Sequence, residues 1–359
     1  MRSALGLARR SLGAVWPNPS VGCILVRDGR VVGRGWTQPG GRPHAESEAI
    51  ARAGSLARGA TAFVTLEPCA HQGETPPCAK ALVRAGVARV VVGLGDPDAR
   101  VNGAGLERLR AAGVKVETGV AEAEAAELNA GYLMRVRAGR PLVTLKAATT
   151  LDGRIATGKG ESRWVTGEAA RAQAHALRAS HDAVAVGAAT ALADDPELTC
   201  RLPGLGRRSP VRVVFDGRLR LSLTSRLVET AREVPTWIVA LKGAEDDRRR
   251  AFRATGVDLV QVEADAEGHP DLAEALAKLG ERGLTRLLVE GGGRLAAALL
   301  RRRLVDRLVW FHAPRIMGGD GLPAAAGFGV DRLGEAPGFR RLSLLEIGGD
   351  LMETYALTT

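Results

Sequence analysis

The chain has 359 residues, of which 45% are apolar and 25% are charged, and its formal net charge is +10. These values are typical of a globular protein with room for two cores, and they exclude a disordered chain. No run approaches the roughly 20 apolar residues of a membrane span, and the first residues lack a signal-peptide core. Four cysteines do not indicate a disulfide framework. We therefore expect a protein of a reducing, cytoplasmic compartment with no membrane partner.

The positive charge is compatible with nucleic-acid binding, but its distribution favours another explanation. Arginine is scattered along the chain, and only 4% of residues are aromatic. Short runs such as Arg248-Arg249-Arg250 are typical of solvated helix faces. We expect pockets for phosphorylated small molecules and no nucleic-acid partner.

Strands and helices alternate in the first part of the chain. Residues 21–26 and 31–36 are predicted to form a hairpin around Asp28-Gly29. Runs of β-branched and apolar residues predict buried strands at 61–66 and 89–93. The intervals predict helices at 44–54, 77–86, 102–112 and 121–137. This alternation indicates an α/β layered sheet.

A break follows at Arg137-Ala138-Gly139-Arg140-Pro141, because glycine and proline end a helix. A second α/β series begins there and does not repeat the first. We therefore predict two domains, at 1–138 and 141–359. The second series predicts strands near 142–147, 182–187, 211–215, 236–240, 286–290 and 306–312.

Residues 44–78 contain the most specific chemical signal. His44, Cys69 and Cys78 supply one imidazole and two thiols, which can hold zinc and leave a fourth position for water. Glu46 lies two residues from His44 and can move protons to and from that water. With Pro68 before Cys69, this is the arrangement of zinc deaminases that act on nucleobase-like rings. The sequence thus predicts a catalytic zinc site with Glu46 as general acid and base.

Simpler explanations of these residues exist. Each cysteine alone is compatible with a buried thiol, and His44 alone with a surface residue. A purely structural zinc site needs a fourth ligand, for which His71 is the only nearby candidate in the sequence. The combination favours the catalytic site. Cys78 is expected near a helix N-terminus, where the helix dipole favours thiolate.

In the second half, Leu287 to Ala298 predicts a strand, a glycine turn and a helix. Glycines allow the backbone to approach a phosphate, and the helix N-terminus offers free N–H groups. The pattern is neither the dinucleotide fingerprint nor the lysine-bearing phosphate loop. A tight packing turn explains it equally well, so the turn alone does not establish a cofactor.

Together these motifs resemble the bifunctional riboflavin-biosynthesis deaminase/reductase family. In the first half the resemblance rests on Asn18 to Gly22, Pro43 to Glu46, Thr65 to Cys78 and Gly95-Asp96-Pro97-Asp98. In the second half it rests on Leu145-Lys146-Ala147, Thr150 to Gly153, Gly160 to Thr166, Ala193 to Thr199 and Val289 to Gly292. It covers nearly the whole chain.

The resemblance implies a cytidine-deaminase-like three-layer domain followed by a dihydrofolate-reductase-like α/β domain. It implies zinc-dependent deamination of 2,5-diamino-6-(5-phosphoribosylamino)pyrimidin-4(3H)-one, then NADPH-dependent reduction of the ribosylamino group to ribitylamino. The implied cofactors are Zn²⁺ and NADPH, and the implied partner is a phosphorylated pyrimidine. A homo-oligomer is compatible with the sequence.

Family positions carry over to individual residues of this chain. Asn18 and His71 match positions that hold the pyrimidine ring. The substrate positions of the reductase are matched by Ser162, Arg178, Leu198, Arg201 and Glu290. The NADPH positions are matched by Ala148, Trp164, Thr190, Asp194, Gly292, Gly293, Arg294, Leu295, Ala296, Ala297 and Ala298. Arg178 and Arg201 are suited to binding a ribose phosphate between them, and Trp164 is suited to covering a flat cofactor ring. Each of these residues alone is also compatible with a structural role.

Two residues depart from the family pattern. Glu74 stands where a basic residue is common, which puts a contact to the deaminase substrate in doubt. Gly217 stands where serine or threonine is common, so a cofactor contact there is restricted to the backbone. The proton donor of the reduction stays open among Lys146, Asp194 and Glu290.

Three other functions account for only part of the chain. A nucleoside or tRNA deaminase with an accessory C-terminal domain explains the first half alone. A reductase with a catalytically dead zinc domain explains the second half, but the intact Glu46 argues against it. A non-enzymatic zinc module leaves the glycine turn and the Ser162-Trp164 block without purpose.

Overall fold

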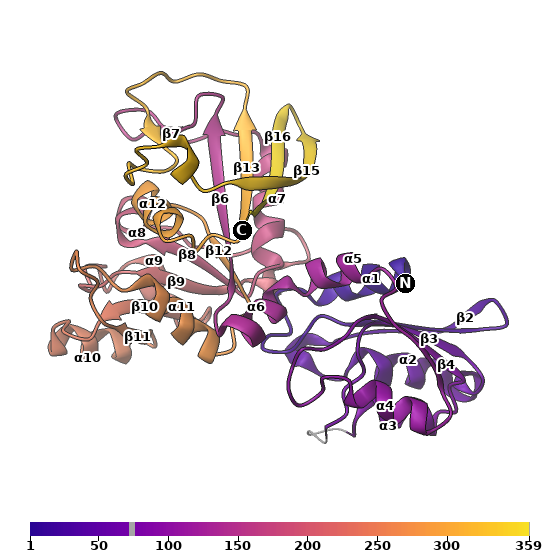
Figure 1. Ribbon diagram of the computed structural model, residues 1–359. Helices are drawn as coiled ribbons and strands as arrows, with labels where there is room; N and C mark the ends of the chain where they lie inside the picture. The colour runs from indigo at the N-terminus through magenta and orange to yellow at the C-terminus, as the bar shows by residue number, and fades with distance from the viewer. Residues whose placement is uncertain (72–75, 359) are drawn as a thin grey trace. The chain divides into compact units, whose positions relative to one another are not determined.

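The computed structural model describes residues 1–71 and 76–358 (Figure 1). The chain divides into two compact units, Met1–Gly139 and Arg140–Thr359. Glu74, the first departure from the family pattern, lies outside the described residues. Among the residues that are described, no helix combines the length and the apolar character that crossing a membrane requires.

The first unit is built on a five-stranded sheet in the order β2-β1-β3-β4-β5. β1 pairs antiparallel with β2 and β3, whereas β3, β4 and β5 run parallel. The predicted hairpin is confirmed, and Asp28 and Gly29 have positive φ in its turn. The strands are β1 Gly22–Arg27, β2 Arg30–Trp36, β3 Thr61–Leu66, β4 Arg89–Leu94 and β5 Lys115–Glu117. The helices are α1 Arg2–Ala8, α2 Ala45–Ala53, α3 Cys78–Arg84, α4 Ala104–Ala111, α5 Glu122–Leu128 and α6 Ala130–Ala138.

Helix α2 lies directly against strand β2, and this contact positions the first turn of the helix. A Cβ atom at Gly35 would lie 2.0 Å from the carbonyl oxygen of Ala45, so only glycine permits the approach. His44 is the N-cap residue of α2 in extended conformation, and Glu46 follows in the first turn. The helix start is therefore fixed by the sheet, and with it the backbone that carries both side chains.

The single helix predicted over 121–137 is wrong, because the structure breaks it into α5 and α6 at Asn129. The Asn129 amide is buried. Its oxygen accepts from the Ser20 N–H at 2.9 Å, and its nitrogen donates to the Ser20 carbonyl at 3.1 Å. Asn129 satisfies both backbone groups of Ser20, and its own backbone leaves helical geometry at φ −97° and ψ 14°.

The second unit is built on a nine-stranded sheet in the order β11-β10-β9-β8-β12-β6-β13-β16-β15. The strands from β11 to β13 run parallel, and β16 and β15 form an antiparallel hairpin at one edge (Figure 1). Its strands are β6 Leu142–Thr150, β8 Ala183–Gly187, β9 Val211–Phe215, β10 Thr236–Leu241, β11 Asp258–Val262, β12 Arg286–Val289, β13 Arg307–Ala313, β15 Phe339–Ile347 and β16 Asp350–Leu357. A separate two-stranded sheet contains β7 Arg154–Ala156 and β14 Leu322–Pro323. The helices are α7 Glu168–Ala179, α8 Ala188–Asp194, α9 Arg226–Glu229, α10 Asp246–Ala254, α11 Leu272–Glu281 and α12 Gly293–Arg301.

The six strands predicted for the second half are confirmed as β6, β8, β9, β10, β12 and β13. The prediction did not include β11 or the edge hairpin β15–β16. The parallel strands are buried on both faces, so their apolar runs are continuous and easily detected.

His181 is a buried histidine just before β8. Its Nδ1 lies 2.7 Å from the Leu177 carbonyl oxygen, and its Nε2 lies 3.0 Å from the Thr144 hydroxyl. Burial lowers the pKa of His181 to about 4. Between the unfolded value near pH 6.5 and the folded value, the unfolded chain binds a proton that the folded chain excludes.

We therefore expect the free energy of unfolding to fall as the pH falls through this window. In His181→Gln the free energy of unfolding should lose a pH dependence of up to about 1.4 kcal/mol per pH unit. Denaturant-induced unfolding of wild type and variant at about pH 7 and about pH 5 measures the difference. Identical pH dependences in the two proteins would contradict the prediction.

Candidate active sites

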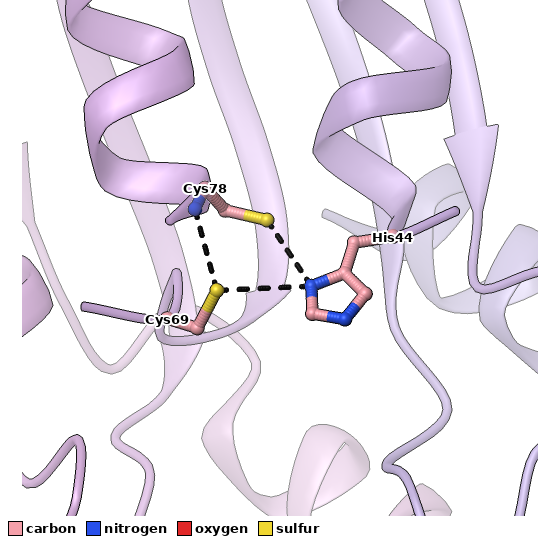
Figure 2. A group of neighbouring side chains, drawn as sticks. All are labelled: His44, Cys69 and Cys78. Atoms are coloured by element: carbon pink, nitrogen blue, oxygen red, sulfur yellow. Dashed lines mark hydrogen bonds between the residues drawn. The ribbon is translucent and has the colours of Figure 1, made fainter. Parts of the chain in front are cut away.

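Three side chains of the first unit form a compact cluster (Figure 2). His44 precedes α2, Cys78 begins α3, and Cys69 lies in the loop after β3. His44 Nδ1 is 3.3 Å from Cys78 Sγ and 3.7 Å from Cys69 Sγ, and the three ligand atoms lie within 4.8 Å of one another. One imidazole and two thiols at this separation fit a zinc ion with an open fourth position. Within the described residues the cluster does not include His71, which argues against a closed structural site.

The protein around the cluster stabilises negative charge on Cys69. The backbone N–H of Cys78 donates to Cys69 Sγ at 3.3 Å. A hydrogen bond from the Cys78 side chain lowers the pKa of the Cys69 thiol to about 4. The same bond, together with burial, raises the pKa of Cys78. Metal binding to this pair of thiols is coupled to the release of protons, because thiolates are the ligands.

Glu67 anchors the loop that carries Cys69. Its carboxylate is buried at the start of α4, where a helix has N–H groups without intrahelical partners. It accepts hydrogen bonds of 3.0–3.4 Å from the backbone N–H groups of Asp96, Gly103, Gly105 and Leu106. The segment Glu67-Pro68-Cys69 is thus held by the fold itself.

A cavity of about 300 Å³ opens beside the cluster. Glu46 lines it with only 3% of its surface exposed, and burial raises the pKa of its carboxyl to about 7. Asn18 and His71 also line it, and His71 Nδ1 is buried with no hydrogen-bond partner among the described residues. The structure therefore brings all of the predicted deaminase residues to one place.

The same cavity contains polar residues that the sequence did not single out for a role. Asp96 and Asp98 belong to the Gly95-Asp96-Pro97-Asp98 motif, whose spacing alone indicates no chemistry. The Tyr132 hydroxyl donates to Asp96 Oδ1 at 3.0 Å, and burial raises the pKa of Asp96. Three arginines complete this wall, namely Arg42, Arg100 and Arg135.

Two neighbouring cavities of about 530 and 490 Å³ lie in the second unit. Their shared residues are Lys146, Trp164, Arg178, Arg201 and Glu290. Of the other predicted residues, Ala148 lines the larger cavity, and the smaller one is lined by Ser162, Thr190, Asp194 and Leu198.

A buried ion pair stands in the shared wall. Arg178 Nε and Nη2 donate to the two carboxylate oxygens of Glu290 at 2.6 and 2.8 Å, and Nη1 donates to the Thr199 carbonyl at 2.9 Å. Burial alone would raise the pKa of Glu290, but Arg178 holds it below its usual value. Arg178 thus donates three hydrogen bonds inside the protein, and it lines both cavities together with Arg201. A phosphate clamp formed by the two arginines stays a prediction. Arg201 keeps about half of its side chain exposed, and its Nη1 pairs with the Glu197 carboxylate at 3.3 Å.

A third cavity, of about 510 Å³, meets the second at Thr190. The predicted residues that line it are Gly292, Arg294, Leu295, Ala297 and Ala298, whereas Gly293 and Ala296 complete the segment without lining it. Gly292 has a φ of +89°, and a Cβ at Gly293 would lie 3.0 Å from the Pro323 carbonyl oxygen. The turn keeps this space clear at the start of α12, which suits the diphosphate of a dinucleotide.

Further residues of these cavities could have been found from helical spacing. Arg171, His175 and Arg178 recur along α7 at intervals of four and three, and all three line the first cavity. Lys146 is half-buried on β6, with Nζ 5.7 Å from the centroid of the Phe311 ring. Burial lowers the pKa of Lys146, and the nearby Glu290 carboxylate opposes the shift.

Two known protein families match separate parts of the chain, one on each side of the boundary between the two units. Residues 1–94 match the cytidine and deoxycytidylate deaminase zinc-binding region, and residues 141–352 match the RibD C-terminal domain. A nucleoside or tRNA deaminase with an unrelated accessory domain does not account for the second match.

Similar proteins extend over nearly the full length. The riboflavin biosynthesis protein RibD of Escherichia coli (strain K12) is 41% identical, covering 98% of this chain and 96% of that one. RibD of Aquifex aeolicus (strain VF5) is 40% identical, and the match covers 98% of this chain and 96% of that protein. The structure of Acinetobacter baumannii RibD, form 1, superposes with a TM-score of 0.89 at 36% identity. The match covers 100% of this chain and 98% of that one. The diaminohydroxyphosphoribosylaminopyrimidine deaminase/5-amino-6-(5-phosphoribosylamino)uracil reductase of Thermotoga maritima has a TM-score of 0.87 at 34% identity, covering 100% and 97%.

Proposed function

Because this chain belongs to the family of bifunctional RibD deaminase/reductases of riboflavin biosynthesis, we propose a division of labour between its halves. Residues 1–138 would deaminate 2,5-diamino-6-(5-phosphoribosylamino)pyrimidin-4(3H)-one. Residues 141–359 would then reduce the ribosylamino group of the product to ribitylamino with NADPH. The observation that carries the proposal is the buried Glu46 carboxylate beside three zinc-type ligands, in a chain whose second unit has its own ligand cavities.

In the deaminase, His44, Cys69 and Cys78 would hold zinc. When bound, zinc supplies Lewis acidity, which makes water a nucleophile near neutral pH. Glu46 would take one proton from the attacking water and pass it to the ring nitrogen. It would then carry the remaining hydroxyl proton of that water to the leaving amine as the C–N bond breaks. A carboxyl with a pKa near 7 can do both, because it gains and loses a proton at similar cost. Ammonia then leaves.

Two further residues would hold the pyrimidine ring. Asn18 and His71 line the cavity that contains Glu46. His71 Nδ1 is buried without a partner among the described residues, and such a group costs free energy unless a ligand satisfies it. We assign His71 to a hydrogen bond with a polar atom on the ring.

In the reductase, NADPH supplies the hydride. Lys146 lies in the wall shared by two cavities, and its lowered pKa makes its ammonium a better acid. We assign Lys146 as the donor that protonates the sugar ring oxygen while C1 accepts the hydride, which breaks the C1–O bond. Glu290, fixed by Arg178, would accept a hydrogen bond from a sugar hydroxyl. Arg201 would bind the phosphate.

A sequential assay tests this proposal. The purified zinc-loaded chain should release one ammonia per phosphorylated diaminopyrimidine without NADPH, and it should oxidise one NADPH when the cofactor follows. A zinc chelator should stop the release of ammonia but spare NADPH oxidation on the already deaminated compound. Ammonia release without later NADPH oxidation would contradict the reductase half. NADPH oxidation on the deaminated compound without any ammonia release would contradict the deaminase half.

A further inference from the structure

The third cavity continues past the predicted cofactor residues to a basic end that the proposed mechanism does not use. Arg220, Arg301 and Arg302 line this end. Two of them are paired with carboxylates of the same cavity, Arg301 with Glu267 at 2.8 Å and Arg302 with Asp265 at 2.7 Å. Their charges are therefore largely compensated by groups that face the same space.

Arg220 is held differently. Its Nε donates to Asp216 Oδ1 at 3.2 Å, and Asp216 is fully buried and does not line the cavity. The other Asp216 oxygen accepts from the Leu221 N–H at 3.0 Å. The Arg220 side chain is 56% exposed, and no hydrogen bond among the described residues uses its Nη groups. The Nε edge of the Arg220 guanidinium is thus held by Asp216, which fixes its orientation. The edge with the Nη groups is available to a ligand.

The neighbouring Gly217 has little room for a side chain of its own. A Cβ atom at Gly217 would lie 2.9 Å from Cγ and 3.0 Å from Cδ of Pro270. The serine or threonine that is common at this position in the family would therefore collide with the Pro270 ring. Any side-chain contact from this turn has to come from another residue, and Arg220 is the residue of the turn that lines the cavity.

The order of the cavities indicates which part of NADPH reaches Arg220. Lys146 and Glu290 line the first two cavities, and their proposed roles put sugar reduction there, so the nicotinamide would bind in the same place. Thr190 joins the second cavity to the third, where the glycine turn suits the diphosphate. The adenosine half then extends towards the basic end.

NADPH differs from NADH by one phosphate on the adenosine ribose, and an arginine fork is suited to a phosphate. We infer that Arg220 binds this phosphate and selects NADPH over NADH. The inference rests on the proposed function for the cofactor itself.

Calorimetric titration of the full chain with NADP⁺ and with NAD⁺ tests the inference without turnover. The wild-type protein should bind NADP⁺ more tightly than NAD⁺. Arg220→Gln should weaken NADP⁺ binding roughly 10- to 100-fold, because charge-assisted hydrogen bonds are lost, and should change NAD⁺ binding by less than about threefold. Arg218→Gln is the matched control, since Arg218 is exposed and does not line the cavity.

Unchanged NADP⁺ binding in Arg220→Gln, or equal weakening of both dinucleotides, would overturn the inference and leave the proposed function standing. If loss of the Asp216 contact prevents folding, Arg220→Lys decides instead. It keeps the charge without the fork, so the ratio of the two affinities should fall severalfold, and an unchanged ratio overturns the inference. A wild type that binds neither dinucleotide would contradict the proposed cofactor itself.

Discussion

Replacement of Glu46 by glutamine should slow the release of ammonia by roughly 10²- to 10⁴-fold, the usual contribution of general acid–base catalysis. Glutamine has the same size but cannot take up and return a proton. Glu46 is not part of the His44–Cys69–Cys78 cluster, so the variant should keep one zinc per chain. Ammonia production and metal content, measured on the same preparation, check both parts of the prediction.

Glu48→Gln is a suitable control because Glu48 lies on the same helix and pairs with Arg52 at 3.0 Å. It should retain both zinc and activity. Near-normal ammonia release by Glu46→Gln would refute the role assigned to this carboxyl. Loss of zinc in the same variant would show that Glu46 supports the metal site instead of moving protons.

Arg201→Ala should impair reduction by roughly 10- to 100-fold or more while ammonia release stays near normal. The exposed Arg201 guanidinium lines both reductase cavities, and no zinc ligand belongs to that unit. Cys69→Ala should have the opposite effect, because it removes a metal ligand. Its NADPH oxidation should remain when the already deaminated compound is supplied. Separate assays of the two half-reactions measure both effects.

Arg207→Ala provides the control for Arg201, since Arg207 is exposed in the same region and lines none of the three reductase cavities described above. It should leave both activities intact. If Arg201→Ala in a folded protein abolished deamination as strongly as reduction, two independent sites on residues 1–138 and 141–359 would be the wrong description.

Predictions that depended on residues close in sequence were the most successful. The turn at Asp28-Gly29 and its flanking alternation were sufficient to predict the β1–β2 hairpin. The cluster of His44, Cys69 and Cys78 was predictable because each ligand stands beside a characteristic neighbour, Glu46 or a proline. Chemistry of this kind is visible without knowledge of the fold.

Features that depend on distant partners could not be predicted in the same way. The helix is interrupted at Asn129, whose side chain hydrogen-bonds the backbone of Ser20, 109 positions away. Arg178 reaches Glu290 across 112 positions, and its helix gives no sign of that pairing. The hairpin β15–β16 was missed because Leu344 and Leu345 are both exposed at the sheet edge and interrupt the expected alternation.

The four backbone hydrogen bonds to Glu67 have a consequence for the thermodynamics of metal uptake. They hold the Cys69 loop through the protein's own backbone, and the β2 contact holds the start of α2 in the same manner. In small zinc modules the chain is unfolded without metal, so the free energy of binding is spent on folding. Here the segments that carry the ligands are also held by hydrogen bonds and packing in which no metal takes part. Little of the free energy of zinc binding should therefore be used to fold the chain. The ion should be exchangeable for another divalent metal while the domain stays folded.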